Sequence, residues 1–145
     1  MDEGRFSLTR SVAFHATHRY HRPDWDDAKN LAAFGACAAP VPHGHDYSCA
    51  ITVTGPLDRE TGMVIDLALL DRLVADEVTG PLHGRLLNDA LPECGPGGAI
   101  PTCETVAGLI GARLAAALRR AGASARVASV RLAEDDTLSA TWTAP

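Results

Sequence analysis

The sequence lacks the features that mark several large classes of protein. No apolar run approaches the ~20 residues that a membrane-spanning helix needs, and the first stretch, MDEGRFSLTR, is polar and acidic, unlike a signal peptide. Basic residues are not gathered into a stripe. The net charge is −5, and Arg119 and Arg120 are the only adjacent basic pair. We therefore expect a cytoplasmic protein that binds neither nucleic acid nor membrane.

The length and composition are those of an ordinary globular domain. The 145 residues fit one domain spanning 1–145, with 46% apolar and 21% charged residues. In the cytoplasm the four cysteines (Cys37, Cys49, Cys94 and Cys103) are expected as free thiols, with two disulfides as the alternative.

Apolar periodicity predicts an α+β fold. Alternating residues indicate strands over 6–14 and 46–55, and two further β-rich runs, 125–134 and 137–143, end the chain. Helical spacing predicts helices over 67–78, capped by Asp66, and over 104–122. Residues 19–36 read as a loop with at most one helical turn, and 79–100 as irregular. The order predicts a four-stranded antiparallel sheet with two helices on one face.

Histidines gather in the first third of the chain. Five of the six lie between positions 15 and 45, and His43 and His45 flank a glycine just before a strand. Residues i and i+2 of a strand share a face, so these two imidazoles would lie side by side. A third imidazole from the end of the first strand would complete a three-nitrogen site of the kind that catalytic Zn²⁺ uses. The alternative is a pair of surface histidines in a loop.

Five segments together resemble one family. FHATHR, NLAAFGACAAPVPHGHDY, GMVIDLALL, TCETVA and AED, spread over residues 6–143, are similar to the 6-pyruvoyl-tetrahydropterin synthase family, which includes the 6-carboxytetrahydropterin synthases. The resemblance implies Zn²⁺ as cofactor, with His18, His43 and His45 as its ligands. His15 falls on a position where the family has a small residue. The roles of His15 and His21 stay open.

The resemblance also implies a catalytic thiol at Cys37. The chemistry needs a base that removes a proton from a carbon next to a metal-bound oxygen. A thiol beside a cation and an imidazole loses its own proton readily. The alternative for Cys37 is a small buried residue.

A ring-binding set follows from the same resemblance. Glu134 matches the family's pterin anchor, because a carboxylate can accept two parallel N–H bonds from a 2-amino-4-oxo-pyrimidine edge. Glu104, preceded by Thr102 and Cys103 in TCE, matches a glutamate near that ring. The alternatives are a hairpin-turn charge for Glu134 and a helix-dipole contact for Glu104.

Two departures from the family pattern bear on catalysis. The family has Leu-Asp-His after its first helix, where this chain reads PLHGRLLND. If the two sequences are aligned without a gap, His83 takes the place of the aspartate and Gly84 takes the place of the histidine. If this chain has a one-residue deletion, His83 corresponds to the histidine and the aspartate is missing. Either way the Asp–His dyad is incomplete. Cys103 replaces a serine or threonine, which is a stronger hydrogen-bond donor.

The resemblance implies the tunnelling fold and a homo-oligomer, commonly a dimer of trimers, whose sheets join into a barrel and cover their open edges. It implies a zinc-dependent carbon–oxygen lyase acting on 7,8-dihydroneopterin triphosphate or a related heteroaromatic, pterin-like small molecule. One alternative is a recruited zinc-dependent cyclase or aldol-type enzyme, which the incomplete dyad favours. The other is a non-catalytic pterin or metal binder, which retention of Cys37 disfavours.

Overall fold

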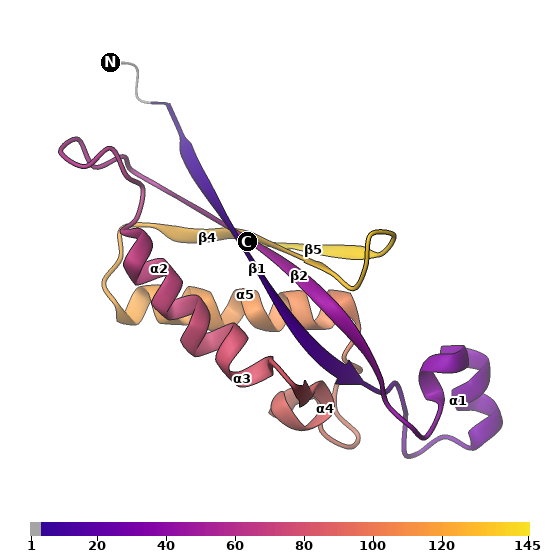
Figure 1. The fold of residues 1–145 in the computed structure, drawn as a ribbon. Helices are drawn as coiled ribbons and strands as arrows, with labels where there is room; N and C mark the ends of the chain where they lie inside the picture. Colours follow the sequence, from indigo (N-terminus) through magenta and orange to yellow (C-terminus); the bar gives the residue numbers. More distant parts are fainter. Residues whose placement is uncertain (1–3) are drawn as a thin grey trace.

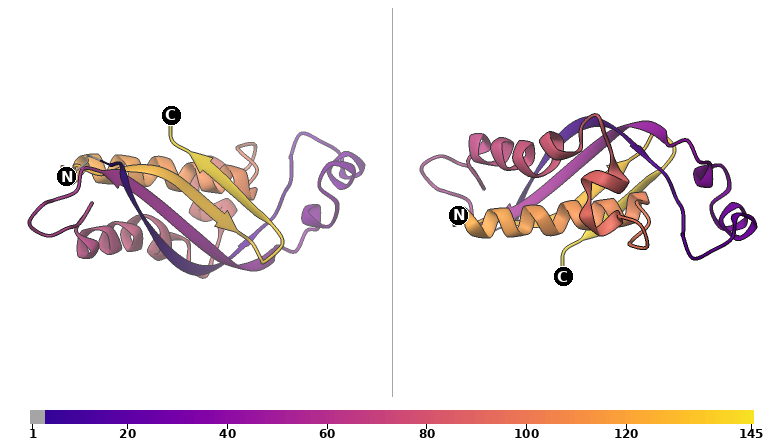
Figure 2. Two further views of the ribbon diagram at one scale, coloured as in Figure 1. Left: turned by 90° about the horizontal axis from the view of Figure 1, so that it is seen from above. Right: turned by 90° about the horizontal axis from the view of Figure 1, so that it is seen from below.

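A five-stranded sheet covered on one face by helices forms the body of the protein. The computed structural model describes residues 4–145. The strands are β1 (Phe6–His18), β2 (His43–Gly55), β3 (Arg85–Leu86), β4 (Arg126–Ala133) and β5 (Ser139–Thr143), in the order β3-β1-β2-β4-β5. The two main helices, α2 (Leu67–Val74) and α5 (Cys103–Arg120), lie on the same face of the sheet (Figures 1 and 2). The α+β class predicted from the sequence is correct.

The long β1–β2 pair brings the predicted metal ligands together. The two strands are antiparallel along their whole length, from Phe6 opposite Gly55 to His18 opposite His43. Alternation then turns Phe14, Ala16 and His18 toward the helices, and all three side chains are buried. The last inward position of β1 is therefore a histidine rather than an apolar residue.

Local signals place both main helices. The side chain of Asp66 accepts a hydrogen bond from the backbone N–H of Ala68 at the start of α2, and Thr102 caps α5 by accepting from Thr105. Arg119 and Arg120 lie in the last turn of α5, where positive charge suits the helix dipole. Buried α5 residues and the inward residues of β2 and β4 form one core, which includes Ile51, Val53, Val106, Ile110, Leu114, Val130 and Leu132.

The four-stranded prediction was incomplete, because the sheet is mixed and has a fifth strand. The four predicted strands are present and antiparallel, but β3 adds a parallel pairing of Arg85 and Leu86 with Ala16 and Thr17. Two residues carry no detectable alternation, so the sequence could not show this strand. It is held by the hydrogen bond from the Gly84 N–H to the carbonyl of His15 (2.7 Å).

Two stretches predicted as irregular contain short helices. Residues 19–36 include α1 (Asp27–Phe34), and η1 (Gly35–Ala38) follows it directly. Between α2 and α5 lie η2 (Ala75–Thr79), α3 (Gly80–Leu82), α4 (Leu87–Ala90) and η3 (Pro92–Cys94). Each has eight residues or fewer, which is too short for a periodic signal to stand out.

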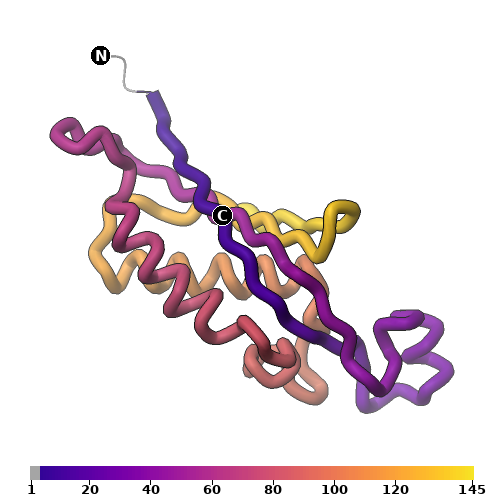
Figure 3. Tube along the Cα trace, viewed as in Figure 1, coloured from indigo at the N-terminus to yellow at the C-terminus, as the bar shows by residue number. Residues whose placement is uncertain are grey.

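The segment between β1 and β2, residues 19–42, forms an arm that reaches beyond the end of the sheet (Figures 1 and 3). The backbone N–H of Tyr20 donates to the carbonyl of Cys37, and the Arg19 guanidinium donates to the carbonyls of Ala38 and Ala39. The buried Asn30 side chain ties α1 to the preceding loop. The start and end of the arm are thus fastened together beside the histidines. Within residues 4–145, no helix is both long and apolar enough to cross a membrane.

Candidate metal centre and active site

Three imidazoles converge where β1 ends and β2 begins. His18 Nε2 lies 2.9 Å from His43 Nε2 and 3.2 Å from His45 Nε2. The ligand atoms of all three residues lie within 4.8 Å of one another. The strand register explains the convergence, since His18 pairs with His43 and the i+2 rule puts His45 on the same face.

The spacing of these nitrogens fits a metal ion. Two nitrogens that are each about 2.1 Å from a tetrahedral ion lie about 3.4 Å apart. The 2.9 Å and 3.2 Å separations come close to that value. Three imidazoles would leave the fourth tetrahedral position open, which is the arrangement of catalytic rather than structural zinc.

The other side of the His18 ring is held by two oxygens. The Tyr47 hydroxyl lies 3.0 Å from His18 Nδ1, and the Pro101 carbonyl also hydrogen-bonds this ring. Metal ligation through Nε2 requires the tautomer with its proton on Nδ1, where the Tyr47 oxygen can accept it. Burial, followed by the two neighbouring histidines, lowers the pKa of His18 to about 4. The neutral form that a metal requires is therefore favoured at neutral pH.

Cys37 lies next to this triad. Its Sγ is 3.8 Å from His43 Nε2, and the side chain is half-buried on η1. Burial and then the negative charge of Glu134 raise the pKa of the thiol. The protein alone thus favours the protonated thiol, and the easy deprotonation expected from the sequence depends on a nearby cation.

Glu134 directly follows β4 and lies beside the triad. The side chain is buried, at 8% exposure, which a solvated hairpin-turn charge would not be. The Tyr20 hydroxyl donates to its Oε1 (3.3 Å), and its Oε2 lies 3.7 Å from His45 Nε2. The buried carboxylate therefore lies between the Tyr20 hydroxyl and one imidazole of the triad.

Two further side chains surround Glu134. The buried Cys103 thiol hydrogen-bonds the carboxylate, and burial, then the Glu134 charge, raises its pKa to about 12. Burial is also the main cause of a raised pKa for Tyr20, with the Glu134 charge second. Both groups stay protonated at neutral pH and can donate to the carboxylate.

Three residues predicted for the site make no hydrogen bond to the triad, Cys37 or Glu134 within residues 4–145. His83 is exposed, and its Nδ1 accepts from the backbone N–H of His15 (3.1 Å) instead of contacting Cys37. Glu104 is exposed in the first turn of α5 and makes no hydrogen bond or ion pair within residues 4–145. The Thr102 hydroxyl is used as the cap of the same helix.

Two tyrosines were missed as site residues. Tyr47 contacts His18, and Tyr20 contacts Glu134. Each follows a predicted ligand by two positions, Tyr20 after His18 and Tyr47 after His45. The same i+2 rule that paired the histidines could have placed Tyr47 on their face.

His15 lies on the other face of the sheet from His18. Its Nδ1 is 2.9 Å from Asp46 Oδ1, and its ring lies over Gly44, where a Cβ would approach within 3.0 Å. The glycine between His43 and His45 therefore leaves room for this ring. His21 is half-buried at the start of the arm.

Comparison with known proteins gives consistent matches. A family model described as 6-pyruvoyl tetrahydropterin synthase matches residues 7–145. Among curated proteins, 6-pyruvoyl tetrahydrobiopterin synthase of Drosophila melanogaster is 48% identical over 67 residues (46% of this chain, 40% of the relative). The Homo sapiens protein of that name is 36% identical over 85 residues, 59% of each chain. The chain spans about half the length of the curated relatives it matches.

A solved structure matches the whole fold. Caenorhabditis elegans 6-pyruvoyl tetrahydropterin synthase superimposes with a TM-score of 0.88 at 25% identity, covering 100% of both chains.

Proposed function

The chain belongs to the 6-pyruvoyl tetrahydropterin synthase family, and from this premise we propose that it is a zinc-dependent carbon–oxygen lyase acting on a dihydropterin or a related heteroaromatic substrate. The observation that carries the proposal is that three kinds of functional group lie within hydrogen-bond or ion-pair distance of one another. A three-imidazole site, a thiol 3.8 Å from one of its nitrogens and a buried carboxylate 3.7 Å from another lie together.

The metal would be held by His18, His43 and His45, whose Nε2 atoms converge. A bound Zn²⁺ supplies Lewis-acid polarisation of substrate oxygens, which acidifies the neighbouring C–H bond. The Tyr47 oxygen can accept a proton held on His18 Nδ1, which would leave Nε2 as the ligand atom.

The chain's own groups would then divide the work. Glu134 accepts N–H donors of the ring through its two oxygens, which orients the substrate side chain toward the histidines. Cys37 would remove the proton at the carbon next to the polarised oxygen, the C–O bond to the substrate's triphosphate would break with its electron pair leaving on the triphosphate, and the protonated thiol would return a proton to the product. The Tyr20 hydroxyl donates to Glu134 Oε1. When the ring binds, this oxygen must either accept from both the tyrosine and the ring or lose its hydrogen bond to the tyrosine.

The proposal includes a homo-oligomer, and a hexamer is the form we expect. Within the described residues β3 pairs only with Ala16 and Thr17, so most of β1 is an open edge, and β5 is the other edge. Open edges favour pairing with another chain. Glu104 and His83, which are exposed and away from the pocket of their own chain, would contribute to the site of a neighbouring subunit.

The test is turnover of 7,8-dihydroneopterin triphosphate by zinc-loaded protein, followed by product analysis. Cys37→Ala should abolish turnover while zinc content and pterin binding persist. A Cys37→Ala variant as active as the parent would remove the thiol from the proton-transfer role. Pterin binding by a parent protein without turnover would favour the non-catalytic binder.

A second candidate, a zinc-dependent cyclase or aldol-type reaction on another heteroaromatic substrate, is favoured by one observation. Gly84 has a φ of 71°, and His83 Nδ1 is engaged with the His15 backbone. This stretch therefore offers no Asp–His pair to assist the thiol. Turnover of other ring systems, with dihydroneopterin triphosphate unchanged, would support this candidate.

A further inference from the structure

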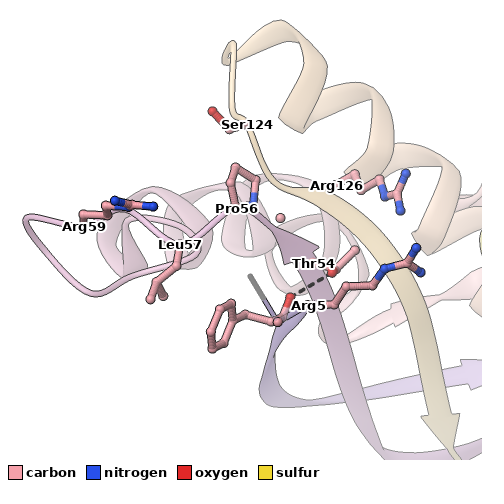
Figure 4. A pocket seen from close by; sticks show the side chains of 10 residues that line it. Arg5, Thr54, Pro56, Leu57, Arg59, Ser124 and Arg126 are labelled. Carbon is pink, nitrogen blue, oxygen red and sulfur yellow. Dashed lines mark hydrogen bonds between the residues drawn. The ribbon is translucent and has the colours of Figure 1, made fainter. Parts of the chain in front are cut away.

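A cavity lies at the opposite end of the sheet from the histidines. It has a volume of about 610 Å³, and its lining includes Arg5, Arg59, Arg126, Ser124, Phe6 and Leu57. We call it the arginine pocket (Figure 4). From His45 to Thr54, which also lines it, β2 runs nine residues, or about 30 Å at about 3.3 Å per residue. The arginine pocket is therefore separate from the candidate active site of the same chain.

The strand register places one arginine of the pocket on each side of β2. Thr54 lies opposite Ser7 of β1 and Arg126 of β4, and Arg5 comes two positions before Ser7. Val127 is buried, so its neighbour Arg126 points to the solvent face of the sheet. In Figure 4 the side chains of Arg5 and Arg126 extend in the same direction, whereas Arg59 lies on the loop after β2.

Among the described residues, no carboxylate lines this cavity. Three other arginines form ion pairs with carboxylates: Arg10, Arg113 and Arg120. No ion pair within residues 4–145 involves an arginine of the pocket, and no aspartate or glutamate is among its lining residues. This concentration of positive charge stands out in a chain whose net charge is −5.

From these observations we infer that the arginine pocket binds a small phosphorylated anion, of the organic polyphosphate class. A guanidinium group presents a planar fork that pairs with two oxygens. Phosphoryl oxygens point in tetrahedral directions, so guanidinium groups approaching from different strands can share them, whereas a planar carboxylate suits a single fork. The Ser124 hydroxyl can add one donor.

The apolar part of the lining fits an organic group attached to the phosphates. Phe6, Pro56 and Leu57 line the same cavity, and Phe6 is 39% exposed. A volume of about 610 Å³ is ample for a ligand of this size. This inference does not rest on the proposed function, because none of the residues of the pocket belongs to the histidine site.

The test is isothermal titration of inorganic triphosphate into the full-length protein at low salt. We expect saturable binding that Arg5→Gln and Arg126→Gln each weaken about tenfold or more, as loss of a charged hydrogen-bond donor does. Binding should also weaken from about 50 mM to about 200 mM NaCl. Arg131→Gln is the matched control, since Arg131 is exposed on the same strand but lies outside the pocket.

The control also removes a competing explanation. Triphosphate bound at the histidine site would contribute equally to the binding measured with Arg126→Gln and with Arg131→Gln. Only the difference in affinity between these two variants therefore reports on the arginine pocket. Equal affinities of the parent, Arg5→Gln and Arg126→Gln would overturn the inference, as would an equal loss in Arg131→Gln. Citrate binding as tightly as triphosphate would overturn the assignment to phosphates.

Discussion

The Tyr47 hydroxyl lies 3.0 Å from Nδ1 of His18, on the side of the ring opposite the other two histidines. His18 is fully buried, at 0% exposure, so its orientation depends on the groups packed around it. Tyr47 is itself a core residue, 1% exposed, stacked on Phe14. The hydrophobic core therefore helps to fix the direction of a proposed metal ligand through the Tyr47 hydroxyl.

Tyr47→Phe should weaken zinc binding. Loss of a hydrogen-bond partner behind a ligating histidine costs about 10–100-fold in metal affinity. The measurement is competition with a chelator of known affinity. Tyr20→Phe is the control, because that hydroxyl bonds Glu134 and not a proposed ligand. Equal zinc affinity in Tyr47→Phe and the parent would show that the Pro101 carbonyl alone orients His18.

His43→Ala should release the metal. Purified parent protein should carry about one Zn²⁺ per chain, as three-nitrogen sites do, and the variant should carry almost none. His15→Ala is the matched control, since His15 is exposed and paired with Asp46 on the other face of the sheet. Elemental analysis decides the question. Full zinc occupancy in His43→Ala would remove His43 from the ligand set.

The metal-free protein should lose stability as the pH falls below about 6.5. The folded pKa of His18 is lowered from 6.5 to about 4, chiefly by burial, and that of His43 is lowered for the same reason. The unfolded chain therefore binds protons first, and stability present above pH 6.5 is lost on the way to pH 4. For His18 this difference corresponds to about 3 kcal/mol.

Urea unfolding of chelator-treated protein at several pH values, at one protein concentration, measures this loss. His18→Gln should flatten the profile between pH 6.5 and 4.5, and His15→Gln should leave it unchanged. An identical slope in His18→Gln and the parent would mean that other groups control the acid lability.

The sequence predicted that His18, His43 and His45 come together, because strand geometry is local. A period of two residues and one antiparallel register suffice to bring His43 and His45 beside His18. Local apolar periodicity, alternating in strands and helically spaced in helices, likewise identified the four long strands and the two main helices. Strand β3 could not be found this way, because it depends on a backbone hydrogen bond between Gly84 and His15, which are far apart in the chain.

Side-chain groupings that cross several strands were also beyond the sequence. The arginines are scattered along the chain, yet Arg5, Arg59 and Arg126 line one cavity once β1, β2 and β4 are paired. Similarly, Tyr20 reaches Glu134 across 114 positions. No local pattern encodes such contacts, which follow from the complete register of the sheet.

Two glycines of α5 should respond oppositely to alanine. At Gly111 a Cβ would overlap the ring of Trp142, whereas at Gly108 it would lie 3.5 Å from that ring, an ordinary contact. Alanine in a helix gains about 1 kcal/mol over glycine. We expect Gly108→Ala to be neutral or stabilising, and Gly111→Ala to cost about 1–3 kcal/mol through overpacking.

Thermal unfolding of the two variants under identical conditions provides the comparison. Gly108→Ala serves as the control for helix propensity, since it adds the same methyl group to the same helix. A Gly111→Ala protein that melts at or above the temperature of Gly108→Ala would show that Trp142 moves aside without cost.

The stretch Leu82-His83-Gly84 lacks the Asp–His pair of the family reaction. In the family arrangement an aspartate orients a histidine that helps the thiol exchange protons, and loss of such a partner can cost orders of magnitude in rate. Gly84 has no side chain, and His83 Nδ1 is bonded to the His15 backbone. We therefore expect turnover of dihydroneopterin triphosphate well below that of family members assayed alongside.

The double variant His83→Asp/Gly84→His should raise that turnover. The backbone imposes a limit, because Gly84 has a φ of 71° and a histidine there adopts a left-handed conformation at a cost of about 1 kcal/mol. There is room for the new side chain, since no atom lies within 4 Å of the position of its Cβ. His83→Asn/Gly84→Gln controls for the added bulk and strain without the acid–base chemistry. Turnover equal to that of the standard enzymes in the parent, with no gain in the double variant, would show that this site does not need the dyad.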